Sequence, residues 1–158
     1  MSSQEGAKVK RLVIGSDHAG FLLKQDLVEH LRKKGYDVLD IGTADEGSVD
    51  YPDFAAKGAR LVAQGKFSLG VLVCGSGVGV AIAANKVAGI RAVTANDPEL
   101  ARLSRAHNDA NMLAIGARFV GPEAARAIVD IWLETAFEGG RHQKRVDKIT
   151  LIERDERS

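Results

Sequence analysis

Five short apolar runs alternate with longer amphipathic segments along the chain. The runs have the length of buried strands, and the segments between them carry apolar side chains at helical spacing. In the first segment, Leu23, Leu27, Val28 and Leu31 would share one helix face, and Gly35 follows where a C-terminal cap belongs. The predicted strands are residues 11–14, 37–41, 69–74, 90–95 and 112–116. The predicted helices are residues 20–34, 51–64, 80–88, 98–107, 122–137 and 141–152, the last followed by a frayed tail.

Strand–helix units joined by short links predict a parallel sheet with helices on both faces. The expected fold class is therefore α/β, a single-domain three-layer αβα sandwich around a five-stranded, Rossmann-like sheet. The 158 residues fit one domain, residues 10–158 with its C-terminal helix and tail, after a disordered N-terminal extension of residues 1–9. In such sheets ligands bind beyond the carboxyl ends of the strands, where the strand order reverses. The residues that end the strands are therefore the candidates for a site.

The composition argues against several classes of function. Basic and acidic residues number 22 and 21, so the net charge of +1 gives no field that would recruit nucleic acid or a membrane. Aromatic residues make up only 5% of the chain and offer few platforms for stacking bases. A single cysteine excludes an intrachain disulfide and a cysteine-cluster metal site. The N-terminus lacks the apolar stretch of a signal peptide, so a cytoplasmic location is expected.

The third predicted strand ends at Cys74, the only cysteine, and glycines follow at positions 75, 77 and 79. One interpretation is a small buried side chain at a tight turn, which is what most free cysteines are. The other is a site, because glycines let the backbone approach a ligand and successive N–H groups can converge on an anion beside the thiol. The spacing alone is weak, since it matches neither the phosphate-loop motif nor G-x-G-x-x-G.

Acids and imidazoles occur at the ends of other elements. Asp17 and His18 follow the first strand, where capping of the next helix and contact with a ligand are about equally favoured. His107 and Asn108 end the fourth helix, where a polar turn is the simpler interpretation and acid–base chemistry by the imidazole is the other.

Three arginines are candidates for binding a phosphate. Arg141 and Arg145 are four residues apart and would share one face of the last helix, and Arg118 follows the fifth strand. Guanidinium groups bind phosphate through paired, charged hydrogen bonds. In isolation, the same cluster would be read as a solvated basic surface.

Together these features fit proton-transfer chemistry on a phosphorylated substrate. A base, a group of free amides, acid–base side chains and an anion-binding group are present, and the sequence has no metal cluster and no cofactor motif. Aldose–ketose isomerisation needs only such groups. A base removes a proton next to a carbonyl, N–H donors hold the enediolate, and the proton returns one carbon over.

Five motifs follow one another from about Lys10 to about Ile152: GSDHAG, DYPDFA, VCGSGVGVAIAANK, RLSRAHNDANMLAIGARFVG and EGGRHQKRV. In this order they resemble the type B ribose-5-phosphate isomerases, which belong to the ribose, allose and galactose phosphate isomerases. The resemblance implies interconversion of D-ribose 5-phosphate and D-ribulose 5-phosphate in the pentose phosphate pathway, without a cofactor or a metal. It also implies a homodimer with sites at the subunit interface, in some members paired into a dimer of dimers.

The resemblance further implies a role for each residue. Cys74 is similar to the base that moves the proton between C1 and C2, and Ser76 replaces a threonine whose hydroxyl assists. Asp17 and His107 resemble the residues that open the furanose ring, with His107 reaching into the partner's site. The residues expected to hold the enediolate and the sugar are Gly75, Gly77, Val78, Gly79, Tyr51 and Asn108. Those expected to bind the phosphate are His18, Arg118, Arg141 and Arg145.

One branch of this family lacks the cysteine and uses a glutamate after the last loop glycine. Val80 stands at that position, so the chain follows the cysteine branch. The substrate remains open, because the same mechanism could act on allose 6-phosphate, galactose 6-phosphate or a tetrose 4-phosphate. A non-catalytic sugar-phosphate sensor that uses the same pocket is the alternative of a different class.

Overall fold

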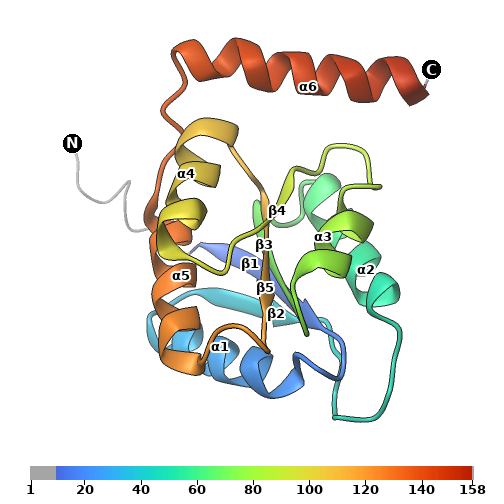
Figure 1. Ribbon diagram of the computed structural model, residues 1–158, viewed down its shortest axis with the longest axis vertical. Coiled ribbons are helices and arrows are strands. Elements are labelled where there is room, and N and C mark those ends of the chain that lie inside the picture. The colour runs from blue at the N-terminus through green and yellow to red at the C-terminus, as the bar shows by residue number, and fades with distance from the viewer. Residues whose placement is uncertain (1–9, 158) are drawn as a thin grey trace.

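The computed structural model describes residues 10–157, so the expectation of disorder for residues 1–9 lies outside the described residues. At its centre is one sheet of parallel strands in the order β2-β1-β3-β5-β4 (Figure 1). The strands are β1 (Arg11–Ser16), β2 (Asp37–Asp40), β3 (Leu69–Cys74), β4 (Ala92–Thr94) and β5 (Met112–Gly116). The helices are α1 (Phe21–Lys33), α2 (Tyr51–Ala63), α3 (Val78–Ala84), α4 (Pro98–Asn108), α5 (Pro122–Glu134) and α6 (Arg141–Arg157).

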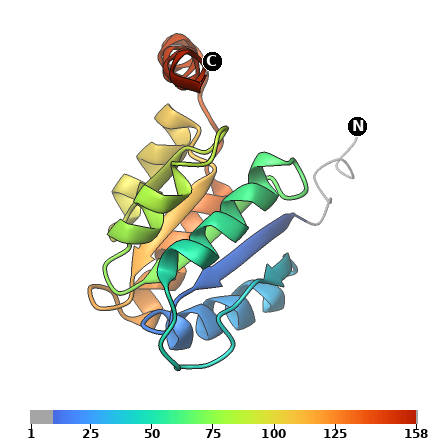
Figure 2. The same cartoon turned by 90° about the vertical axis from the view of Figure 1, so that its right-hand side faces the viewer.

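Helices cover both faces of the sheet, which gives the three predicted layers (Figure 2). Successive side chains of a strand point to opposite faces, so Leu12 and Ile14 of β1 enter one core while Val13 enters the other. Helices α1, α4 and α5 pack on the first face, and α2 and α3 pack on the second. The predicted α/β class with a five-stranded parallel sheet is confirmed.

The strand order reverses between β1 and β3. From β1 the chain crosses through α1 to β2 on one side, and it then returns through α2 to β3 on the other side. The pairing of Gly15 with Leu72 and of Ser16 with Val73 brings the carboxyl ends of β1 and β3 together. This is the switch point at which open parallel sheets bind ligands.

Several element boundaries differ from the predicted ones, among them those of β4, α3 and α5. β4 spans Ala92–Thr94 rather than residues 90–95, and it starts late because the N–H of Arg91 bonds the side chain of Asn111 instead of a neighbouring strand. α3 begins at Val78, two residues earlier than predicted, because Gly77 takes a left-handed conformation and ends the loop, and it ends at Ala84 rather than at residue 88. α5 ends at Glu134 rather than near residue 137, where the chain turns extended to cross to α6.

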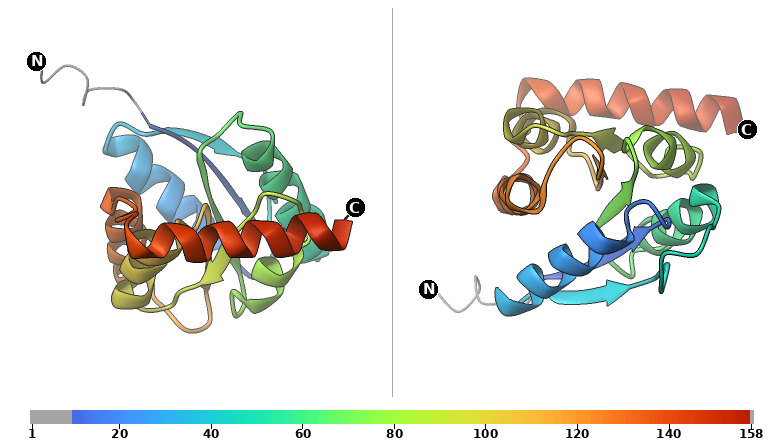
Figure 3. Two further views of the ribbon diagram at one scale, coloured as in Figure 1. Left: turned by 90° about the horizontal axis from the view of Figure 1, so that it is seen from above. Right: turned by 60° about the horizontal axis from the view of Figure 1, so that its bottom comes forward.

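The frayed tail predicted after residue 152 is wrong, because α6 continues to Arg157. Its last turns are held by tertiary contacts: Glu153 accepts a hydrogen bond from the N–H of Gly89, and Arg157 donates one to the carbonyl of Lys86. The helix crosses the end of the molecule outside the three layers (Figures 1 and 3). Within residues 10–157, no helix combines the length and the apolar character needed to cross a membrane.

Candidate active site

A cavity of about 400 Å³ opens where β1 and β3 end and α3 begins. It therefore lies at the switch point of the sheet, as the sequence predicts. Most of the predicted site residues line it, together with Ala19 and Ile82. These predicted residues are Asp17, His18, Tyr51, Cys74, Gly75, Ser76, Val78, Gly79 and Arg118.

The thiol of Cys74 is buried and accepts a hydrogen bond from the N–H of Gly77, with an N···S distance of 3.2 Å. Because side chains alternate along β3, Cys74 and Leu72 point to the face of the sheet that α2 and α3 cover. The thiolate is the form of cysteine that acts as a base, and the N–H of Gly77 is directed at the sulfur that would carry its charge. Cys74 is therefore both a buried side chain at a tight turn and part of the lining of the cavity.

Two side chains at the end of β4 fix the loop between β3 and α3. The hydroxyl of Thr94 donates to the carbonyl of Gly77, at 2.7 Å. The side-chain amide of Asn96 donates to the carbonyl of Ser76, at 3.3 Å, and accepts from the N–H of Gly116, at 2.8 Å. The loop is thereby tied to the end of β5, and its N–H groups are held in position before a ligand arrives.

The loop needs a glycine at position 77. Gly77 has a φ of 80°, a left-handed conformation that side chains rarely adopt. A Cβ at this position would also lie 2.9 Å from the carbonyl carbon of Ile115. The next amide, that of Val78, donates to the hydroxyl of Ser76, at 3.1 Å, so the loop satisfies part of its own hydrogen-bonding capacity.

Two further glycines make room for side chains that border the cavity. A Cβ on Gly75 would lie 3.1 Å from the guanidinium carbon of Arg118, and a Cβ on Gly79 would lie 2.5 Å from the ring of Tyr51. Arg118 also donates its backbone N–H to the carbonyl of Gly75, at 3.0 Å. The sequence suggested that these glycines expose amides. The structure adds that, without side chains of their own, they leave room for the guanidinium of Arg118 and the ring of Tyr51.

Asp17 makes a turn contact before α1 and also lines the cavity. Its carboxylate is buried and accepts a hydrogen bond from the N–H of Gly20, at 3.1 Å, which closes the turn before α1. The same side chain lines the cavity. The hydrogen bond to Gly20 therefore does not remove the carboxylate of Asp17 from the cavity.

His18 is oriented by the loop that precedes α2. Its Nδ1 accepts a hydrogen bond from the backbone N–H of Val49, at 3.1 Å. A ring nitrogen that accepts carries no proton, so in this arrangement the proton of the neutral ring sits on Nε2. His18 can therefore donate a hydrogen bond from Nε2.

Three predicted site residues lie at the opposite edge of the sheet, the one where the strands begin (Figure 1). His107 is in the last turn of α4, shortly before β5 begins, whereas Cys74 is the last residue of β3. Arg141 and Arg145 are exposed in the first turns of α6. A single chain therefore does not bring these residues to the cavity that Cys74 lines.

A second histidine accompanies His107 at this edge. The ring of His142 stacks on that of His107 with 4.1 Å between the centroids. Burial lowers the pKa of His142 from its ordinary value of 6.5, and the charges of His107 and Arg141 act in the same direction, while Glu138 opposes them. His142, which stacks on His107, therefore resists protonation.

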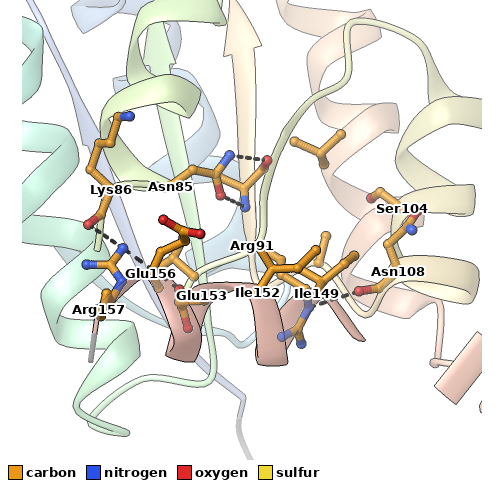
Figure 4. A pocket seen from close by; sticks show the side chains of 14 residues that line it. Asn85, Lys86, Arg91, Ser104, Asn108, Ile149, Ile152, Glu153, Glu156 and Arg157 are labelled. Atoms are coloured by element: carbon orange, nitrogen blue, oxygen red, sulfur yellow. Dashed lines mark hydrogen bonds and ion pairs between the residues drawn. The ribbon is translucent and has the colours of Figure 1, made fainter. Parts of the chain in front are cut away.

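Asn108 lines a different cavity, of about 850 Å³, between β4, α4 and α6 (Figure 4). Arg91 donates from Nε to the backbone carbonyl of Asn108, at 3.0 Å, and Ile149 and Ile152 of α6 line the same cavity. Asn108 thus belongs with its neighbour His107 to the edge opposite Cys74.

Sequence reasoning missed the residues that hold the site in place. Thr94 and Asn96 stand at the carboxyl end of β4, so the rule of strand ends that singled out Cys74 could have found them. Ile82 lines the cavity one turn after Val78, which only the position of α3 reveals. The contact of Val49 with His18 depends on the path of a loop and left no signal in the sequence.

Residues 12–149 match the ribose/galactose isomerase family. Over 145 residues the chain is 52% identical to ribose-5-phosphate isomerase B of Escherichia coli K12, covering 92% of this chain and 97% of that protein. The structure is similar to that of ribose-5-phosphate isomerase B from Clostridium thermocellum, with a TM-score of 0.90, 51% identity, and coverage of 92% of this chain and 98% of that one. It is also similar to ribose-5-phosphate isomerase B from Mycoplasma genitalium with bound ribulose-5-phosphate, with a TM-score of 0.88, 44% identity, and coverage of 91% and 96%.

Proposed function

The chain belongs to the ribose/galactose isomerase family and is an aldose–ketose isomerase, and we propose that it interconverts D-ribose 5-phosphate and D-ribulose 5-phosphate. The observation that carries the proposal is the buried thiol of Cys74, which accepts an N–H bond from Gly77 and lines the cavity at the switch point. A carboxylate, an imidazole and a guanidinium line the same cavity. Phosphorylated sugars are charged and retained in the cytoplasm, where we expect the protein to act.

Cys74 is the proposed base. As a thiolate it takes the proton from C2 of the open-chain aldose, and the electron pair of that C–H bond forms the C1–C2 double bond of the enediolate. A proton then passes from O2 to O1, assisted by the hydroxyl of Ser76. The thiol returns its proton to C1, O2 becomes the ketone oxygen, and no atom is gained or lost.

The negative charge that forms on O1 and O2 needs hydrogen-bond donors to stabilise it. The proposed donors are the N–H groups of the loop from Gly75 to Gly79. Contacts from Thr94 and Asn96 fix this loop. Removing one preorganised donor of this kind typically costs about 3 kcal/mol of transition-state stabilisation.

The rest of the substrate is held by charge and acid–base groups. Arg118 and His18 line the cavity and are the proposed phosphate ligands within one chain. For ring opening, Asp17 and His107 are the proposed pair: one takes the proton of the anomeric hydroxyl, and the other protonates the ring oxygen as its bond to C1 breaks. Asp17 lines the cavity, whereas His107 does not.

A homodimer with shared sites is the proposed assembly. Two-fold symmetry can place the edge that carries His107 and Arg141 of one chain against the edge that carries Cys74 of the other, twice over. Val78 and Ile82, four residues apart on α3 beside the cavity, are 51% and 58% exposed. Exposed apolar side chains next to a site support a contact with a second copy. The partner would then supply His107, Asn108, Arg141 and Arg145.

Hydrogen exchange in deuterated water tests the function. Ribose 5-phosphate is expected to exchange its C2 proton and to form ribulose 5-phosphate. Faster turnover of allose 6-phosphate, galactose 6-phosphate or erythrose 4-phosphate would reassign the substrate. Tight binding of a sugar phosphate without exchange of any of them would favour the sensor and overturn the proposal.

A further inference from the structure

His107, Glu138 and His142 come together at the edge of the molecule opposite Cys74. The Nε2 atoms of His107 and His142 are 4.0 Å and 3.6 Å from Oε1 of Glu138. The possible ligand atoms of the three residues all lie within 4.8 Å of one another. They come from three segments of the chain, namely α4, the link after α5, and α6.

Backbone hydrogen bonds hold these side chains together. The N–H of Glu138 donates to the carbonyl of Ala106, at 3.0 Å, which ties the link to the last turn of α4 beside His107. The N–H of His142 donates to the carbonyl of Gly139, at 2.9 Å, and the two imidazole planes are 14° apart. The cluster is therefore positioned by the fold.

His142 has the most buried side chain of the three. Only 8% of it is exposed, and its Nε2 has no hydrogen-bond partner in the described part of the chain. The nearest carboxylate oxygen, that of Glu138 at 3.6 Å, is beyond hydrogen-bonding distance. A buried polar atom left without a partner typically costs about 1–3 kcal/mol, so this nitrogen points to a ligand that supplies the missing contact.

We propose that His107, Glu138 and His142 form a binding site for a divalent transition-metal ion of the zinc type. Two imidazoles and one carboxylate suit zinc and leave a fourth position for water. Ligand atoms around one tetrahedral zinc ion stand about 3.3 Å apart, so rotations of the three side chains close the site. Arg141 and Arg145 bring positive charge near the cluster, which makes the carboxylate of Glu138 essential for holding a cation.

The metal acts as an inhibitor in this proposal, and that part rests on the proposed function. An ion bound to Nε2 of His107 prevents this nitrogen from taking or giving a proton in ring opening. Zinc is therefore expected to slow turnover of the cyclic sugar while it leaves Cys74 free.

Calorimetric titration of the full chain with zinc chloride tests the site. Wild type is expected to bind about one zinc ion per chain, and Glu138→Gln and His142→Gln to bind at least about tenfold more weakly. His30→Gln removes a histidine outside the cluster and is the matched control, with unchanged binding. Glu138 is half exposed, so its substitution keeps the test open if His142→Gln unfolds; thermal unfolding without metal checks both.

The thiol of Cys74 is the competing zinc ligand, so Cys74→Ala is titrated as well. Zinc binding that persists in Cys74→Ala and is weakened in Glu138→Gln supports the proposal. Binding that is lost in Cys74→Ala, or that is equal in wild type and Glu138→Gln, overturns it.

Activity measurements on the same proteins separate the site from the function. Zinc at a concentration that saturates wild type is expected to inhibit it and to leave Glu138→Gln at its metal-free rate. Zinc binding at the cluster in a protein that isomerises no sugar phosphate would refute the function and leave the site standing. Full activity in zinc-saturated wild type would refute the inhibitory role. If the protein isomerises ribose 5-phosphate but Glu138→Gln binds zinc as tightly as wild type, the metal site is refuted and the proposed function stands.

Discussion

The N–H of Gly77 donates a hydrogen bond to the sulfur of Cys74 across 3.2 Å, and this contact joins the end of β3 to the start of α3. It forms because Gly77 adopts a left-handed φ of 80° immediately before the helix. The proposed base and one of its hydrogen-bond donors are therefore set by the same tight turn. The remaining parts of the site depend on residues from elsewhere in the chain.

Replacing the base should stop proton transfer without preventing binding. Cys74→Ser is expected to lower kcat by about 10²–10⁴-fold with little change in KM, because a hydroxyl is a much weaker base than a thiolate. Steady-state kinetics with ribose 5-phosphate measure both constants, and circular dichroism checks the fold. A variant that keeps a third or more of the wild-type kcat would show that another group is the base.

Adding one methyl group to the loop should displace Tyr51. In Gly79→Ala the new Cβ would lie 2.5 Å from the tyrosine ring, so an increase in KM and a loss of about 1–3 kcal/mol of stability are expected. Gly121→Ala is the matched control, because no heavy atom lies within 4 Å of the Cβ that it adds.

The double variant Gly79→Ala with Tyr51→Ala isolates the cause of that loss. If the clash is responsible, the two changes in the free energy of unfolding are less than additive, because the ring is no longer there to be displaced. Additive changes in urea unfolding would assign the effect of Gly79→Ala to something other than Tyr51.

Asn96 should matter for both stability and catalysis. Asn96→Ala removes the side-chain bonds to Ser76 and Gly116, so a loss of about 1–3 kcal/mol and a lower kcat are expected. Asn85 makes two comparable bonds to the backbone of Ala92 away from the site. Asn85→Ala should therefore lower stability and leave kcat unchanged. A kcat that falls equally in both variants would mean that the contacts of Asn96 with the loop have no special role in catalysis.

The stability of the protein should fall with acid through His142. Its pKa is lowered from the ordinary 6.5 by burial, so the unfolded chain accepts a proton that the folded chain resists. This contribution is fully present above pH 6.5 and is lost as the pH falls from there through the lower folded-state value. Urea unfolding between about pH 7 and pH 5, with a chelator present, should show a smaller loss in His142→Gln than in wild type. Equal losses in the two proteins would show that His142 is not the group that titrates.

The sequence was most informative where chemistry follows from the ends of strands. Cys74, Asp17 and Arg118 line one cavity because the carboxyl ends of parallel strands meet at one edge, and the apolar runs reveal those ends. Side chains that act over long sequence distances were not predictable. Asn96 reaches Gly116 twenty residues away, and Glu153 holds α6 through Gly89 sixty-four residues away.

Hydrophobic periodicity could not predict where the site residues far from Cys74 lie either. These residues are His107, Asn108, Arg141 and Arg145. The helical pattern gives the length of α4, but the position of its last turn relative to Cys74 depends on the strand order. The resemblance to a family supplied the expectation that His107 acts from a partner chain, which the separation of the two edges supports.

Mixing two inactive variants tests the shared site most directly. In a dimer of one Cys74→Ala chain and one His107→Ala chain, one site lacks both groups and the other has both. Refolding an equal mixture pairs the chains at random, so half of the dimers are mixed and about a quarter of the wild-type activity should return. A mixture that stays at the mean of its two inactive parents, although the chains exchange, would contradict a site built from Cys74 of one chain and His107 of the other.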